Sequence, residues 1–208
     1  SSDVSSHQAF VRGYWTRMYV LNNLTTTDIG IKHNIIPPHI KANKITIKKY
    51  LFDRGLIETF TFLQGLVYGK YLDAATPYPK VKSVLRTLKE SGWCIYVISH
   101  KTRWPIIGKK IDLRTAALNW IKNNGFTEFF EPISQQIIFN NDREDKIQSI
   151  VKTNCDVFID DLPEILTSKK IQDHTLKILF DPDDNYKNSG FLVANHSVDV
   201  LTIIKLNQ

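Results

Sequence analysis

From Pro79 onward the chain alternates segments of helical periodicity with short apolar runs. The helical segments lie near 81–88, 113–121, 145–151 and 197–206, and the apolar runs lie at 93–98, 137–139, 157–159 and 176–180. Short apolar runs are typical of strands buried on both faces, and their alternation with helices predicts a parallel sheet covered by helices. This pattern constrains the chain to the α/β class.

Residues that favour helix ends support these helix boundaries. The expected caps and stops are, in chain order, Gly92, Asp112, Asn123 to Gly125, Asp142 with Asp145, and Ser197. The first half is less regular. Residues 45–65 are most simply two helical pieces broken at Gly55, and residues 14–21 are rich in aromatic and β-prone side chains.

Composition excludes several classes of protein. Of 208 residues, 42% are hydrophobic and 23% are charged, so neither a disordered nor a fibrous chain is indicated. No apolar stretch approaches the roughly 18 residues that span a bilayer, and no secretory signal pattern is seen. Cys94 and Cys155 lie in or beside apolar runs, as small buried side chains do. We expect a cytoplasmic protein without a membrane partner.

Two adjacent carboxylates, Asp160 and Asp161, end the apolar run 157–159. The last residues of such a strand lie at the carboxyl edge of the sheet, where open α/β folds bind ligands. Two like charges side by side repel each other and are costly to desolvate, which a facing cation would relieve. The pair therefore suggests a Mg²⁺ site. The alternative is that Asp161 caps a helix opened by Pro163 while Asp160 is solvated.

Ser99 follows the strand 95–98, and Lys146 lies early in a helix. Together with Asp160 and Asp161, these residues resemble the haloacid dehalogenase-like (HAD) hydrolase superfamily. The matching segments are Pro77-Tyr78-Pro79, Tyr96 to Thr102 and Phe158 to Pro163. The resemblance implies a three-layer Rossmann-like core in which Ser99 and Lys146 bind phosphate while Asp160 and Asp161 hold Mg²⁺.

The nucleophile of that superfamily is the first Asp of an Asp-x-Asp-x-Thr/Val motif near the N-terminus, and this motif does not occur here. The best positional substitute is Asn22 in the segment 19–26, but an amide cannot replace a nucleophilic carboxylate. Either the sequence begins after the catalytic strand, or the protein keeps the scaffold without the nucleophile. In the second account, which we favour, residues 14–21 supply the central strand of the sheet.

The resemblance also implies a division of the chain. Residues 1–21 form an N-terminal segment with a possible core strand, residues 22–75 form a small helical cap-like region, and residues 76–208 form the α/β core.

A basic loop follows Ser99 and contains His100, Lys101, Arg103 and Trp104. His100, Lys101 and Arg103 are candidates for binding an anionic substrate through charge-assisted contacts, although a plain basic surface loop is an equal alternative. The net charge of +6 allows nucleic-acid binding, but no interleaving of aromatic and basic residues accompanies it. His33 and His39 suggest a zinc site, but no Cys or carboxylate completes the set of ligands.

Two functions from different classes follow. The first is a Mg²⁺-dependent phosphohydrolase-like protein that binds a small phosphorylated molecule. The second is a non-catalytic phosphate- or nucleotide-binding or regulatory module on the same scaffold. Nucleic-acid association is a third and weaker hypothesis.

Overall fold

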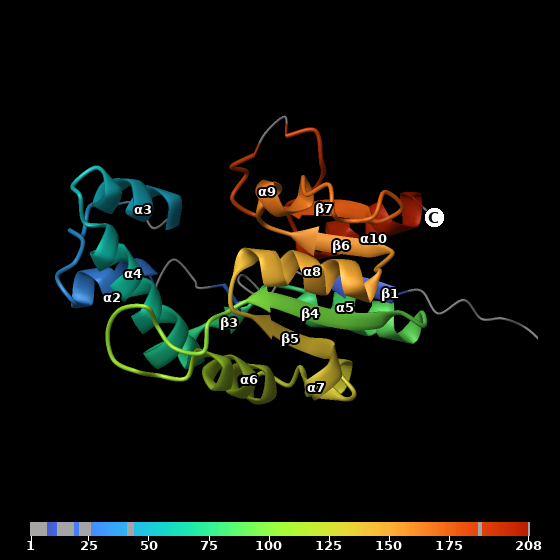
Figure 1. Cartoon of the computed structure of the whole chain (residues 1–208), viewed down its shortest axis with the longest axis horizontal. Coiled ribbons are helices and arrows are strands. Elements are labelled where there is room, and N and C mark those ends of the chain that lie inside the picture. Colours follow the sequence, from blue (N-terminus) through green and yellow to red (C-terminus); the bar gives the residue numbers. More distant parts are fainter. Residues whose placement is uncertain (1–7, 12–18, 21–25, 41–43, 187–188, 208) are drawn as a thin grey trace, which may run out of the picture. The chain divides into compact units, whose positions relative to one another are not determined.

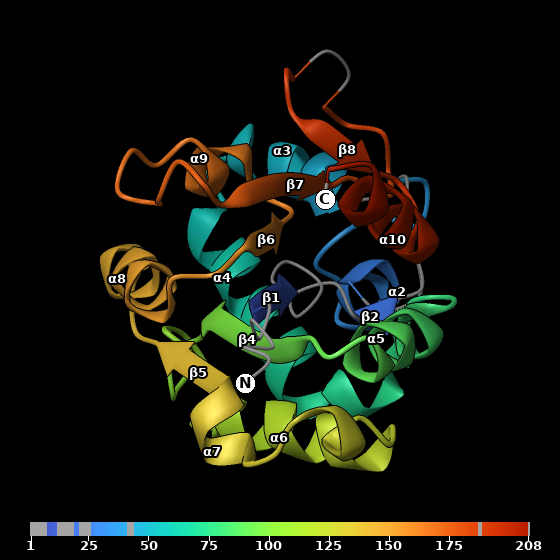
Figure 2. The same ribbon diagram turned by 90° about the vertical axis from the view of Figure 1, so that its right-hand side faces the viewer.

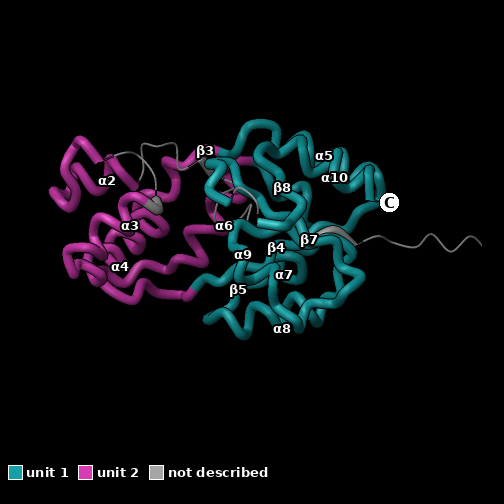
Figure 3. Tube along the Cα trace, turned by 90° about the horizontal axis from the view of Figure 1, so that it is seen from above, with its two compact units in different colours: residues 1–18, 77–101, 125–208 teal, residues 19–76, 102–124 magenta. Residues whose placement is uncertain are grey.

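A computed structural model of the chain describes residues 8–11, 19–20, 26–40, 44–186 and 189–207. The chain divides into two compact units, drawn in teal and magenta in Figure 3. Unit 1 comprises residues 1–18, 77–101 and 125–208, and unit 2 comprises residues 19–76 and 102–124. The division expected from the sequence placed 102–124 in the core, whereas its contacts group this segment with 19–76.

Unit 1 contains a six-stranded sheet in the order β5-β4-β1-β6-β7-β8, of which Figure 1 labels all strands but β8. Every neighbouring pair is parallel, as the alternating pattern predicts. The α/β class is therefore confirmed. The strands are β1 (Gln8–Val11), β4 (Cys94–His100), β5 (Ile137–Asn140), β6 (Val157–Asp160), β7 (Leu176–Phe180) and β8 (Leu192–Ala194).

Most helices of unit 1 contact strands of this sheet. The helices of this unit are α5 (Val81–Glu90), η3 (Thr127–Phe129), α7 (Ile133–Gln136), α8 (Arg143–Thr153), α9 (Pro163–Leu166) and α10 (Ser197–Leu206). Helix α5 contacts β4 and α10, while α8 contacts β4 and β5. Figure 2 shows α8 and α9 on one side of the row of strands and α5 and α10 on the other.

The strand between β4 and β6 is β1, with Ala9 paired to Ile95 on one side and to Val157 on the other. Residues 14–21 were expected to supply this strand. Tyr19–Val20 instead forms β2, which pairs with β3 (Thr76–Pro77), and residues 12–18 and 21 lie outside the described residues. The expectation relied on β propensity, which depends strongly on context and does not show which strands a segment will pair with.

Most of the expected helix ends are confirmed. Gly92 has a φ of 85° after α5, and Asp142 accepts a hydrogen bond from the N–H of Asp145 at the start of α8. The expectation for Ser197 is wrong, because the N-cap of α10 is His196. The Asp199 carboxylate accepts the N–H of His196 at 2.7 Å, so a carboxylate inside the first turn secures the helix start and Ser197 is buried.

Unit 2 is mainly helical. Its elements are α2 (Thr26–Lys32), α3 (Lys44–Phe52), α4 (Ile57–Gly65), the π-helix η1 (Leu66–Lys70), η2 (Leu72–Ala74) and α6 (Leu113–Asn123). Gly55 has a φ of 70° between α3 and α4, which confirms the break expected there. A buried cluster holds the helices together, formed by Ile29, Ile36, Ile47, Leu51, Phe60, Leu63 and Val67.

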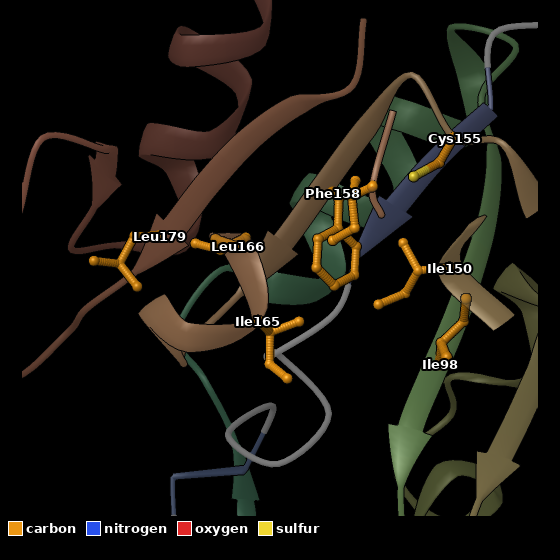
Figure 4. Packing of buried hydrophobic residues seen from close by; sticks show 8 residues of the cluster. Ile98, Ile150, Cys155, Phe158, Ile165, Leu166 and Leu179 are labelled. Carbon is orange, nitrogen blue, oxygen red and sulfur yellow. The ribbon is translucent and has the colours of Figure 1, made fainter. Parts of the chain in front are cut away.

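The core of unit 1 is centred on β6 and the helices beside it. Phe158 is fully buried and packs in one cluster with Ile150, Ile165 and Leu166, as Figure 4 shows. These side chains come from β6, α8 and α9, so the same packing that stabilises unit 1 also fixes the end of β6. Among the described residues, no helix is both long and apolar enough to cross a bilayer.

Replacing Phe158 by Ala removes a fully buried ring from this cluster and should lower the free energy of unfolding by about 3–5 kcal/mol. Chemical denaturation followed by circular dichroism measures this change. Leu192→Ala in β8, where the side chain is 41% exposed, is the control and should cost less than about 1 kcal/mol. Equal losses in the two variants would contradict the assignment of Phe158 to the core.

Candidate functional site

Polar residues lie at or just beyond the carboxyl ends of β4, β5, β6 and β7 in the sheet of unit 1. Ser99 lies near the end of β4, Asn140 ends β5, Asp160 ends β6 with Asp161 next, and Asp181 follows β7. Their exposed fractions are 2%, 7%, 1%, 9% and 1%. Buried polar groups at this edge are where open parallel sheets bind ligands. The edge is therefore the candidate site.

The strand register places Ser99 and Asp161 at the same level. Phe10 of β1 pairs with Tyr96 on one side and with Phe158 on the other. Ser99 and Asp161 each lie three residues beyond these partners. Strands in a sheet are about 4.8 Å apart, so backbones separated by β1 are about 10 Å apart at this level. A ligand of small-molecule size could contact both residues.

Lys146 and Asp160 form an ion pair at the end of β6. The Lys146 Nζ lies 3.4 Å from Asp160 Oδ2, and the two side chains are 5% and 1% exposed. Lys146 belongs to α8, whose buried residues also include Ile147 and Ile150, so the packing of this helix directs the lysine to the sheet edge. Two of the residues singled out in the sequence are thus brought together.

Burial raises the pKa of the Asp160 carboxyl above its ordinary value. The Lys146 ammonium and the N–H of Leu162, which donates to Asp160 Oδ1 at 3.0 Å, act in the opposite direction. The alternative drawn from the sequence is that Asp161 caps the helix after Pro163. In the structure the adjacent N–H, that of Leu162, donates to Asp160 and not to Asp161. Within the described residues, α9 has no side-chain cap hydrogen bond at its N-cap residue, which is Leu162.

The loops after β4 and β5 are tied together around Asn140. The N–H of Lys101 donates to the Asn140 carbonyl at 2.9 Å, and the Ser149 hydroxyl donates to Asn140 Oδ1 at 2.7 Å. His100 Nε2 lies 3.0 Å from the carbonyl of Asn141. Lys101 is 6% exposed, which places a second cation among the buried polar residues of unit 1. These contacts fix the backbone that carries Ser99.

Asn140 and Asp181 were not singled out from the sequence. Asp181 Oδ2 accepts the N–H of Tyr186 at 2.7 Å, and the Asn195 amide donates to the Asp181 carbonyl at 2.6 Å. Both residues are the first polar positions after an apolar strand, which is the signal that drew attention to Asp160. Applying that signal to all strands would have found them.

The predicted substrate-binding residues fall in different units. His100 and Lys101 belong to unit 1, with His100 exposed and Lys101 buried, whereas Arg103 belongs to unit 2. Arg103 Nε donates to Asp112 Oδ2 at 2.9 Å, and its guanidinium lies 5.1 Å from the ring centre of Trp104. Asn22, the positional substitute for the nucleophile, lies outside the described residues.

Asp112 accepts the N–H groups of Arg114 and Thr115, which confirms that it caps α6. Burial acts to raise its pKa, but the Thr115 N–H and the Arg103 guanidinium hold the pKa below its ordinary value. The loop before Asp112 packs against α4, because a Cβ on Gly108 would come within 2.9 Å of the Phe62 ring. Arg103 therefore lies on an anchored loop.

His, Cys, Asp and Glu are the side chains that most often bind metal ions in proteins. In the part of the chain that the structure describes, no three of them gather in a way that could hold a metal ion. His33 is exposed with Nε2 3.1 Å from the Tyr71 hydroxyl, and His39 is exposed as well. Any metal held by Asp160 and Asp161 would need water or a ligand to complete its coordination.

Comparisons with known proteins bear on the fold. No protein-family model matches the chain, and a search of curated proteins finds no match. Among solved structures, the chain is similar to a HAD-superfamily hydrolase from Ehrlichia chaffeensis, with a TM-score of 0.55 and 16% sequence identity. The alignment covers 97% of this chain and 98% of that chain. The chain therefore shares its fold with this protein, as expected from the resemblance noted in the sequence.

The buried ion pair can be tested with a double-mutant cycle. Lys146→Met should lower the free energy of unfolding by about 3–5 kcal/mol, because it leaves the Asp160 carboxylate buried without its partner. Asp160→Asn should cost less, because burial already disfavours the charged form of Asp160. The double variant should lose less than the sum of the two, since both charges are then removed. Denaturation in urea measures the three changes. Additive losses would show that the two groups do not interact.

The raised pKa of Asp160 also predicts a dependence of stability on pH. The native state holds this proton more tightly than the unfolded state, whose pKa is about 3.9. The stabilising contribution is therefore complete below about pH 3.9 and is lost as pH rises through the raised native pKa. Asp160→Asn should make the free energy of unfolding less dependent on pH above about 4. Asp173→Asn, at an exposed position, should keep the wild-type profile.

Proposed function

We propose that unit 1 binds Mg²⁺ and the phosphate group of a small molecule at the carboxyl edge of its sheet. The observation that carries this proposal is the buried Lys146–Asp160 pair beside Asp161 at the end of β6. A buried ion pair is rarely the most stabilising way to fill a core, so its presence at a ligand-binding edge favours a role in binding.

The charges of the buried residues support a cation. Lys101 and Lys146 contribute two positive charges when ionised, and Asp160, Asp161 and Asp181 contribute three negative charges. Mg²⁺ keeps several waters and needs only one or two carboxylates, which Asp160 and Asp161 can supply. Asp161 is the more exposed of the pair and is the direct candidate ligand. Asp160, held by Lys146 and Leu162, orients it.

A phosphate group would be held by Ser99 and Lys146. A hydroxyl donor and an ammonium offer the charge-assisted hydrogen bonds that phosphate oxygens accept. Mg²⁺, when bound, would neutralise further phosphate charge. His100 and Lys101, on the loop that leaves the same strand, are the nearest candidates in sequence for contacts to the remainder of the ligand.

Such a site could either hydrolyse a phosphorylated ligand or bind it without turnover. In the superfamily that the motifs resemble, the nucleophile directly follows the central strand. The central strand here is β1, and the residues that follow it in the sequence are Arg12, Gly13 and Tyr14. None of the three is a carboxylate, so this position offers no group that could form an aspartyl-phosphate. We therefore propose ligand binding without turnover.

The proposal includes the expected architecture. Helices on both sides of β4 support a three-layer core in unit 1 (Figure 2). The helical composition of unit 2 supports its role as a cap, with the segment 102–124 added to residues 19–76. A cytoplasmic location fits the free thiols Cys94 and Cys155.

Isothermal titration with MgCl₂ tests the metal site. The wild-type protein should bind Mg²⁺, and Asp161→Asn should weaken binding by at least about tenfold because it removes the direct ligand. Asp173→Asn makes the same change of charge at an exposed position before β7 and should leave the affinity unchanged. Equal weakening in both variants, or no binding by the wild type, would contradict the metal site.

Hydrolysis of p-nitrophenyl phosphate with and without Mg²⁺ tests the choice between the two activities. The proposed outcome is no Mg²⁺-dependent turnover by a protein that binds Mg²⁺. Turnover that requires Mg²⁺ and disappears in Asp161→Asn would establish the phosphohydrolase instead.

A further inference from the structure

The net positive charge of the chain arises from one unit. Unit 2 contains 12 Lys and Arg against five Asp and Glu, whereas unit 1 contains 15 against 16. The net charge of +6 therefore arises from +7 in unit 2 and −1 in unit 1. A small unit with this excess attracts polyanions and repels other cations.

Cations and aromatic rings meet repeatedly on unit 2. Lys32 at the end of α2 and Lys70 at the end of η1 lie 5.5 and 5.1 Å from the ring centre of Tyr71. His33 approaches the Tyr71 hydroxyl at 3.1 Å. These residues come from two separate helices, so the fold assembles a cluster of basic side chains around one half-buried ring.

The same arrangement recurs elsewhere in unit 2. The Arg54 guanidinium lies 3.8 Å from the ring centre of Tyr50, and Lys48 lies 5.2 Å from that of Phe52. Lys110 lies 4.7 Å from the ring centre of Trp104, which also contacts Arg103. Phe52 and Trp104 are 39% and 38% exposed, so parts of both rings remain accessible to a ligand.

We propose that unit 2 binds single-stranded nucleic acid. Its lysines and arginines would contact successive phosphates, and unpaired bases would stack on the rings beside them, which is how many proteins bind single strands without sequence preference. Some of these pairs are local in the sequence, whereas Lys32 and Tyr71 become neighbours only in the fold. This binding is separate from the phosphate site of unit 1.

Other polyanions match these features less well. A duplex offers phosphates but keeps its bases stacked inside, so the exposed rings would have no partner. An anionic membrane attracts cations but likewise offers no bases. The pairing of cations with accessible rings is what favours a single strand.

Fluorescence anisotropy with a labelled 20-nucleotide single strand of mixed sequence, as DNA and as RNA, tests this proposal on the full chain. The Kd should rise with salt, and the Lys32→Glu, Lys70→Glu double variant should raise it by at least about tenfold. Losing two phosphate contacts should also reduce the slope of log Kd against log salt by about 1.4. Trp104→Leu should weaken binding by about fivefold or more.

The matched control is Lys152→Glu with Lys205→Glu in unit 1. These lysines also lie in the last turns of their helices, α8 and α10, so the double variant has the same net charge and the same helix-end effect. It should bind within about twofold of wild type. Asp161→Asn should also bind normally, which separates this proposal from the metal site.

Four outcomes would overturn the proposal. They are the absence of salt-dependent binding to the single strand, equal weakening by the two double variants, tighter binding to a duplex of the same sequence, and tighter binding to vesicles of phosphatidylcholine and phosphatidylserine. Binding to RNA, DNA or both with the expected loss in the Lys32→Glu, Lys70→Glu variant would support it.

Discussion

The pairing of β1 with both β4 and β6 is the constraint on which unit 1 depends. Only four residues, Gln8–Val11, form this strand, yet without it the backbone groups on the facing edges of β4 and β6 would be buried without partners. The strand also sets the levels of its neighbours. Because Phe10 pairs with Tyr96 and with Phe158, Ser99 and Asp161 end at the same height of the sheet. The site is a consequence of this register.

Burial then determines how the charges at this edge behave. Lys146 and Asp160 lie 3.4 Å apart with almost no exposure, so each depends on the other to remain charged. Lys101 and Asp181 add a second cation and a further carboxylate to the same unit. Such a set is stable only with hydrogen bonds to the backbone, which Leu162 and Tyr186 supply. The electrostatics of the edge are thereby fixed before any ligand arrives.

Local signals predicted much of the fold. Strands β4 to β7 and the caps at Asp112 and Asp142 follow from apolar runs and from single polar residues, because these features act within one element. Features that need distant partners were missed. The strand β1 is too short to be recognised from its sequence. Asn140 can be recognised only from its hydrogen bonds to residues elsewhere in the chain. The sequence of helix α6 resembles that of a core helix, although the helix groups with unit 2.

The sequence by itself determined the class of fold, the strands β4 to β7 and the residue types at the carboxyl edge, because hydrophobic periodicity and capping are local properties. Only the tertiary structure decided which strand is central, that Lys146 reaches Asp160, and that Lys32 reaches the ring of Tyr71. These are contacts between residues far apart in the chain, and packing alone selects them.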